Sequence, residues 1–112
     1  MSIKSAMRGV AVPLLEDEAD DEVTSEAIAI PNSFHNHKVS VTGSAGVASG
    51  VVTVESAPTA DYAGTWSQVT NPVTVVAETT IEVIFTGIFQ AIRTRISTAI
   101  GSGTVSTEYI GS

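Results

Sequence analysis

A chain of 112 residues, of which 43% are hydrophobic, suffices for one domain and leaves no room for a second independent core. It contains no cysteine, which excludes disulfides, thiol nucleophiles and cysteine-based metal sites. The net charge of −7, with only five Lys and Arg residues, argues against a nucleic-acid partner, because phosphate binding draws its affinity from basic side chains.

The choice of residues favours β-structure. Val and Ile are common, Leu occurs only at positions 14 and 15, and Ser and Thr are abundant. β-Branched side chains are stiff at χ1 and suit a pleated sheet better than a helix. No apolar run approaches the roughly 20 residues that span a bilayer, and the N-terminus lacks the basic-then-apolar layout of a signal peptide. We therefore expect an all-β domain that is made in the cytoplasm and has no membrane partner.

Residues 1–26 differ from the rest. A mildly apolar stretch at 9–15 precedes a run of like charges, which resists packing, so we predict an N-terminal arm over 1–26 and a β-sandwich domain over 27–112. The alternative is an edge strand with a solvated loop. In the arm interpretation Val12, Leu14 and Leu15 fill a partner's groove, and deleting 1–24 leaves the domain folded but weakens its attachment. The acidic run holds Glu16, Asp17, Glu18, Asp20, Asp21, Glu22 and Glu26.

From residue 27 onward, strand patterns alternate with turn signals. Val39 and Val41 alternate with polar residues, which is typical of a half-buried strand, and the glycines of 43–50 indicate a connection. Prolines and Asn-Pro or Asp-x-x-Gly segments mark the interruptions. The predicted strands cover 28–30, 38–42, 52–57, 65–69, 73–76, 79–86, 89–100 and 104–110.

The last third of the chain carries the clearest strands. Ile81, Val83 and Phe85 share one face of 79–86. The run 89–100 also fits a helix, because its isoleucines recur at i, i+4 and i+8, but its Ser and Thr residues and flanking glycines favour a strand. Residues 101–103 predict a hairpin turn. About seven or eight short strands indicate a single antiparallel β-sandwich or jelly roll.

The sequence offers little for catalysis. A hydrolase triad needs a nucleophile, a His base and an orienting acid, and neither His35 nor His37 lies beside a G-x-S-x-G pattern. A strand would place both imidazoles on one face, and a trimer axis would then offer six nitrogens to a metal. Two imidazoles without a third ligand are more simply solvated side chains beside a turn. We expect no enzyme activity, no cofactor and no functional metal.

Two further clusters have competing interpretations. The acidic run suggests calcium, but it lacks the central glycine and alternating spacing of an EF-hand loop, which favours a solvated charge run. Tyr62 and Trp66 lie close enough in sequence to form a sugar-stacking platform, whereas such a Trp more often caps a sandwich core.

Arg93 and Arg95 point away from the face that holds Ile92, Thr94, Ile96, Thr98 and Ile100. Two guanidinium groups on one strand face are suited to grip a carboxylate-rich neighbour, such as the acidic arm of an adjacent subunit. The alternative is that they are edge charges that discourage unwanted strand pairing.

Five segments in order give the chain a recognisable layout: VSVTG at 39–43, GVVTVES at 50–56, D-x-x-G-T-W at 61–66, GIFQAIRTRI at 87–96 and GTVSTEYIG at 103–111. This layout resembles small β-sandwich structural proteins of tailed bacteriophage particles, in which a ladder of strands ends in a Phe-x-x-x-Arg-x-Arg strand and a Gly-Thr-Val hairpin. The resemblance covers about two thirds of the chain and is one of overall pattern, without a diagnostic motif.

The resemblance implies a structural part of the virion, present in many copies. Few aromatics and an acidic charge favour the outside of the capsid, so the first expectation is a decoration or cement protein bound to the major capsid protein or another virion protein. The alternative is a tail, fibre or baseplate module that binds host carbohydrate. A homo-oligomer, as a trimer, is expected because a small domain gains apolar burial by sharing faces.

Overall fold

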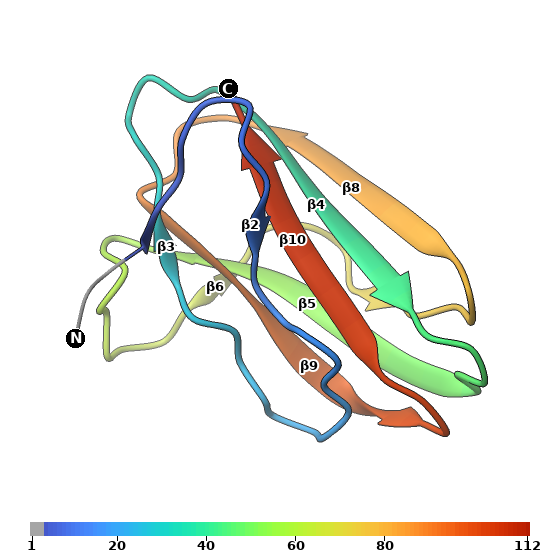
Figure 1. Ribbon diagram of the computed structural model, residues 1–112. Helices are drawn as coiled ribbons and strands as arrows, with labels where there is room; N and C mark the ends of the chain where they lie inside the picture. Colours follow the sequence, from blue (N-terminus) through green and yellow to red (C-terminus); the bar gives the residue numbers. More distant parts are fainter. Residues whose placement is uncertain (1–3) are drawn as a thin grey trace.

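The computed structural model describes residues 4–112, which form two packed β-sheets and no helix (Figure 1). This confirms the predicted all-β sandwich. Five long strands make up most of it: β4 (Asn36–Gly43), β5 (Ser49–Ala57), β8 (Thr80–Thr86), β9 (Ala91–Gly101) and β10 (Val105–Gly111). Five strands of two residues complete the sheets: β1 (Lys4–Ser5), β2 (Val12–Pro13), β3 (Ile28–Ala29), β6 (Ser67–Gln68) and β7 (Val73–Thr74).

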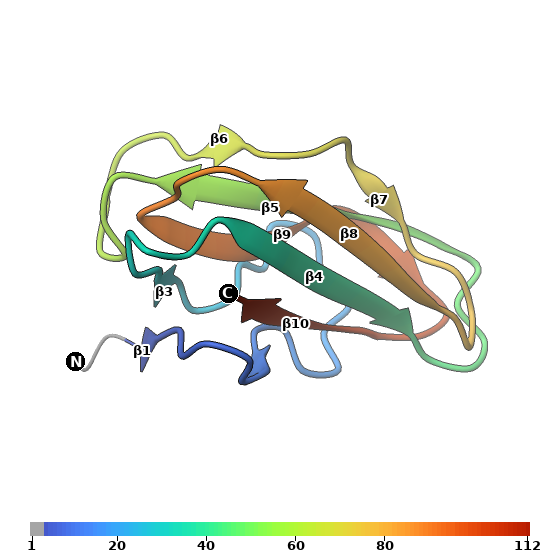
Figure 2. The same ribbon diagram turned by 90° about the horizontal axis from the view of Figure 1, so that it is seen from above.

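The two sheets form separate layers, as Figure 2 shows from above. Sheet A has the order β1-β3-β9-β5-β6, with β7 also paired to β5, and sheet B has the order β2-β10-β4-β8. All pairs are antiparallel except β1 and β3. The strand count exceeds the predicted seven or eight because β1 and β2 lie in the segment predicted to be an arm.

The core lies between the inner faces of the sheets. Val39 and Val41 of β4 face Val52 and Val54 of β5 across the sandwich, and all four are buried. Their burial follows from the period of two along a strand, which sends alternate side chains to opposite faces. The remaining fully buried large side chains include Ile28, Ile92, Ile96, Val105 and Tyr109.

The segment 91–101 is a strand, as its Ser and Thr content predicts, and not a helix. Ile92, Thr94 and Ile96 lie in the core as predicted. Thr98 is exposed, contrary to the expectation, because the β5–β9 register shifts beyond Ile96. Gly50 sits at this irregularity with φ 139°, where a Cβ would collide with Ile100.

The turn at 101–103 is not a hairpin. β9 belongs to sheet A and β10 to sheet B, so this connection crosses between the layers and joins strands that do not pair. Ser102, with φ 64°, provides the sharp change of direction. Gly-Ser-Gly predicts a tight turn correctly, but a local pattern does not reveal whether the next strand pairs with the last.

The N-terminal segment packs along its own sandwich, which corrects the prediction of a separate arm for the described residues 4–26. β2 pairs with β10, and the side chain of Leu15 is only 2% exposed in the core. The backbone N–H of Leu15 donates to Thr107 Oγ1 at 3.0 Å. Val12 and Leu14 are partly buried against the same core. The segment therefore binds along β10 of its own chain, whereas the sequence predicted that it would bind a groove on a partner.

Candidate functional site

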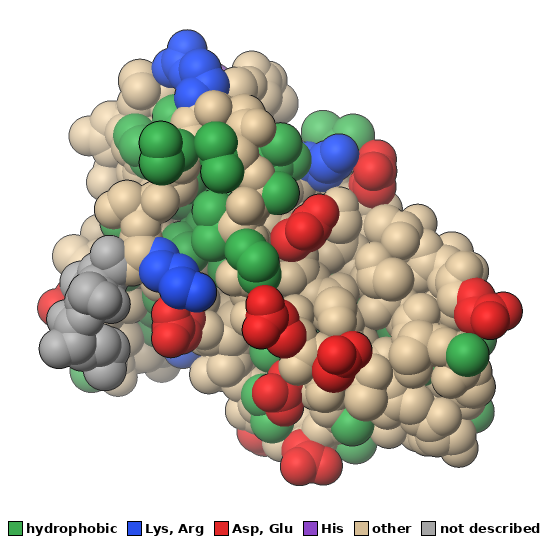
Figure 3. All heavy atoms as spheres, viewed as in Figure 1, with side chains coloured by type: hydrophobic (Ala, Val, Ile, Leu, Met, Phe, Trp, Pro, Cys, Tyr) green, Lys and Arg blue, Asp and Glu red, His purple; other side chains and the backbone are tan. Residues whose placement is uncertain are grey.

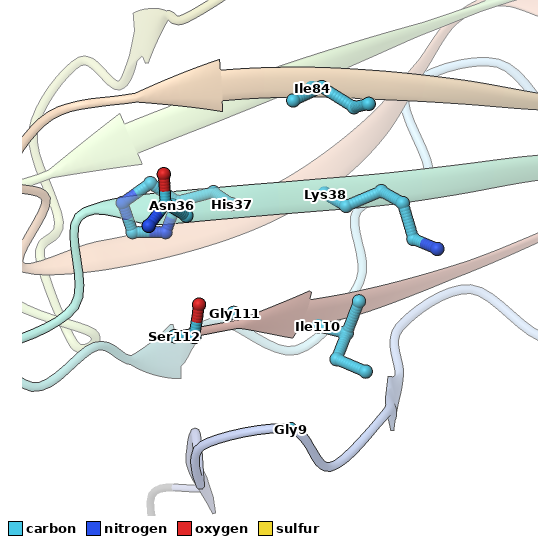
Figure 4. A pocket seen from close by; sticks show the side chains of 8 residues that line it. All are labelled: Gly9, Asn36, His37, Lys38, Ile84, Ile110, Gly111 and Ser112. Carbon is cyan, nitrogen blue, oxygen red and sulfur yellow. The ribbon is translucent and has the colours of Figure 1, made fainter.

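A hollow of about 300 Å³ lies on the outer face of sheet B. Its floor is a row of three side chains, in which Lys38 of β4 stands opposite Ile84 of β8 on one side and Ile110 of β10 on the other. Figure 4 shows the three side chains on neighbouring strands. Gly9 of the N-terminal segment forms another part of the lining. The hollow is therefore open, shallow and mainly apolar.

More apolar surface adjoins this hollow. Met7 and Val10 form a turn in which the N–H of Val10 donates to the carbonyl of Met7 at 3.1 Å, and both side chains are exposed. The turn is held against the end of β10, because the N–H of Gly9 donates to the carbonyl of Gly111 at 2.9 Å. We call the side chains of Met7, Val10, Ile84 and Ile110 the apolar patch.

The patch has few charges. In Figure 3 apolar side chains gather over the N-terminal segment and the adjoining sheet, and most of the visible acidic side chains lie toward the other end of this face. Lys38 Nζ lies 3.4 Å from Glu82 Oε1, and both side chains are well exposed, so this ion pair contributes little stability. Lys38 stands between Ile84 and Ile110, and the exposed Arg8 lies within the Met7–Val10 turn, so these charges interrupt the patch. A mainly apolar surface with few charges is suited to protein contact.

His37 borders the hollow, but its imidazole is in the core and only 2% exposed. The ring stacks on Phe85 and meets Phe89 edge-on, with centroid distances of 5.1 and 5.3 Å. His35 is exposed and precedes β4, so the two histidines do not share a strand face. The expectation of two solvated histidines is therefore wrong for His37.

Both ring nitrogens of His37 have partners. Nε2 lies 2.8 Å from the carbonyl oxygen of Gly87, which can only accept, so Nε2 carries a proton and donates it. Nδ1 lies 2.6 Å from the hydroxyl of Tyr109, which donates to it when the ring is neutral. Burial raises the pKa of Tyr109 to about 12, which keeps this donor protonated. Neither nitrogen is free to act as a base at the hollow.

The arginines predicted to bind a partner are instead engaged within the chain. Arg93 Nε and Arg95 Nε donate to the two carboxylate oxygens of Glu55 at 2.9 and 3.0 Å, and Arg95 also donates to Glu22 at 3.0 Å. Hydrogen bonding to Glu55 raises the pKa of Arg95 above its ordinary value. Their strand, β9, lies between β3 and β5, so the arginines are not edge charges either. The acidic segment meets Arg95 as expected, but within one chain.

Trp66 and Tyr62 do not form an open stacking platform. Trp66 is 8% exposed, and its Nε1 donates to the carbonyl of Tyr62 at 3.0 Å. The guanidinium of Arg93 lies 4.3 Å from the indole centroid and covers one face of the ring. Tyr62 alone is exposed. The structure therefore removes the geometric basis for sugar stacking on this pair.

A second, polar hollow of about 500 Å³ lies on sheet B between the N-terminal segment, β4 and β10. Glu16, Asp17 and Glu108 line it together with hydroxyl side chains. Within residues 4–112 no three His, Cys, Asp or Glu side chains are grouped so that they could hold a metal ion. The carboxylates are spread along an open surface.

No protein-family model matches the chain, and no curated protein matches it either. Residues 4–112 include no helix that is long and apolar enough to cross a membrane.

Sequence reasoning missed the apolar patch, although part of its signal was present. Ile81, Val83 and Phe85 share one face of their strand, so Ile84 between them has to point to the other. In the structure Ile84 is 72% exposed. Ile110 and Val10 carry no comparable signal, because their proximity depends on the pairing of β2, β10 and β4.

Proposed function

We propose that the protein is a structural component of a virus particle, a capsid decoration or cement protein that attaches through the apolar patch of sheet B. The observation that carries the proposal is the exposure of this patch on a domain in which Arg93, Arg95 and Trp66 are engaged internally. Large exposed apolar surfaces on folded proteins mark sites of protein contact. The virion setting comes from the resemblance of the strand layout to phage sandwich proteins.

The chemistry of the surface supports attachment over catalysis. The apolar hollow is bordered by a histidine whose nitrogens are both hydrogen-bonded, and the polar hollow is lined by carboxylates and hydroxyls without a histidine. The apolar hollow therefore has no free base, and the contact in the polar hollow between the Ser106 hydroxyl and Asp17 Oδ1 is long, at 3.4 Å, and exposed, without a histidine to activate the hydroxyl. Burial of exposed Ile, Val and Met side chains on a capsid surface would supply the binding free energy.

The test is to purify virions of the virus that encodes the chain, separate heads from tails, and quantify the chain in each fraction by mass spectrometry. A decoration protein is expected in the head fraction, in a high and regular ratio to the major capsid protein. Recovery in the tail fraction alone would favour the tail, fibre or baseplate alternative. Absence from both fractions would refute a virion role.

A further inference from the structure

Strand β8 forms one edge of sheet B, and this edge is open along the whole strand. It is the last strand in the order β2-β10-β4-β8, and among the residues that the structure describes only β4 pairs with it. In Figure 1 β8 lies at the margin of the front sheet, with no element beyond it. An edge of this kind presents unpaired backbone N–H and C=O groups to any strand that can align with it.

Most of the features that usually protect an edge are missing from β8, and its one charged residue is Glu82. It has seven residues, no proline, no lysine, and an unbroken register with β4. The other edge strands, β1, β2, β6 and β7, have two residues each, and β2 contains Pro13. β8 is therefore the edge best suited to accept another strand.

The inner face of β8 is also incompletely covered. Ile81, Val83 and Phe85 are only partly buried, whereas their partners in β4 include the fully buried Val39 and Val41. The difference arises because β4 has neighbours on both sides and β8 has one. An added strand beside β8 would bury the apolar surface that remains.

The backbone groups that face outward can be identified from the ladder. The N–H of Gly43 donates to the carbonyl of Thr79 at 3.1 Å, and the N–H of Gly87 donates to the carbonyl of His35 at 3.0 Å. Hydrogen-bonded pairs alternate with non-bonded pairs along an antiparallel ladder, so Ile81, Val83 and Phe85 direct their backbone groups toward β4. The residues directed outward are Thr80, Glu82, Ile84 and Thr86.

We propose that two copies of the chain associate edge to edge through β8, about a twofold axis beside Val83. This register sets Thr80 opposite the partner's Thr86 and Glu82 opposite the partner's Ile84, so every outward N–H and C=O of the four residues gains a partner. On the inner face Val83 meets the partner's Val83, and Ile81 meets the partner's Phe85. Antiparallel strands pair in this way when their outward backbone groups stand opposite one another and their facing side chains are compatible.

Shifted registers fit less well. An axis beside Glu82 would set Glu82 against the partner's Glu82, which is a repulsive contact. An axis beside Ile84 would leave the outward groups of Thr80 without a partner. Edge pairing closes after two copies, so this proposal puts a dimer in place of the trimer expected from the sequence. The proposal of a dimer rests on the open edge of β8 alone and does not depend on the proposed attachment to a capsid.

Sedimentation of the purified chain tests the dimer. Ile84→Glu would set a new carboxylate opposite the partner's Glu82 at both symmetry-related contacts, and we expect self-association to weaken about tenfold or more. The double variant Glu82→Lys with Ile84→Glu creates opposite charges at both contacts and is expected to restore the dimer. A wild-type monomer at about 1 mM chain would overturn the proposal. A trimer, an unaffected Ile84→Glu dimer, or failure of the folded double variant to associate would also overturn it.

Cross-linking tests the register independently, because the chain has no cysteine of its own. Non-hydrogen-bonded partners have Cα atoms about 4.5 Å apart, within disulfide range, so Val83→Cys is expected to give a covalent dimer under mild oxidation. The control Ile84→Cys is more exposed but lies two residues out of register with its own copy, beyond the roughly 7 Å limit. Equal cross-linking of the two variants, or none with Val83→Cys, would contradict the register.

Discussion

Glu55 forms ion pairs with both Arg93 and Arg95 from a position where its side chain is only 8% exposed. Removal of one partner from a poorly hydrated ion pair leaves the other charges uncompensated. We predict that Glu55→Gln lowers the free energy of unfolding by about 2–3 kcal/mol, measured by urea denaturation. Glu82→Gln is the control, because its ion pair with Lys38 is exposed and should be worth less than about 1 kcal/mol. Equal losses in the two variants would contradict this role of Glu55.

The buried Tyr109 hydroxyl gives the fold a pH dependence at the alkaline end. Its pKa is raised from 10.0 to about 12, so the folded state favours the neutral phenol. This contribution is fully present below pH 10 and is lost as the pH rises through 12, because the unfolded chain releases the proton first. The expected loss is up to about 3 kcal/mol.

The contribution of Tyr109 is measured by urea unfolding between pH 9 and about pH 12, with Tyr109→Phe as the comparison. The variant is less stable at neutral pH, because His37 Nδ1 loses its donor, by about 1–3 kcal/mol. Its stability should then fall less steeply than that of the wild type above pH 10. Parallel pH curves for the two proteins would show that Tyr109 is not the group responsible.

At the scale of elements, the segment from β2 to Leu15 closes one side of the sandwich. Leu15 is in the core and its backbone is hydrogen-bonded to β10. We predict that Leu15→Ala lowers the free energy of unfolding by about 2–5 kcal/mol and that deletion of residues 1–24 costs at least as much. Urea denaturation of both variants tests this. A truncated chain as stable as the full one would restore the independent arm expected from the sequence.

The long strands could be predicted because each buries one face and alternates with a period of two. The position of residues 4–26 along the sandwich could not be predicted, because backbone hydrogen bonds hold this segment in place. The N–H of Glu22 donates to the carbonyl of Ile96, and that of Ser25 donates to the carbonyl of Thr94, while the acidic side chains remain outside. Such backbone hydrogen bonds cannot be predicted from the pattern of side chains.

The candidate sites were less predictable than the fold for a related reason. Arg93 and Arg95 stand out as a pair in the sequence, but their partner Glu55 lies on a strand 38 residues away in sequence from Arg93. The stacking of Arg93 on Trp66 depends on the same tertiary packing. Groups that look available in a sequence are often satisfied by segments that are distant along the chain.

For the whole molecule, the central claim is that the protein acts by attachment through the apolar patch. Val10 lies in the patch and is 47% exposed, whereas Val76 lies between β7 and β8 and is 46% exposed, which makes the two a matched pair. The decisive measurement is co-sedimentation of purified chain with capsids that lack it, for the wild type, Val10→Asp and Val76→Asp. We predict that Val10→Asp weakens binding about tenfold, through lost apolar burial and a buried charge, while Val76→Asp binds as the wild type does. Equal binding by all three folded proteins, or a loss confined to Val76→Asp, would contradict the claim.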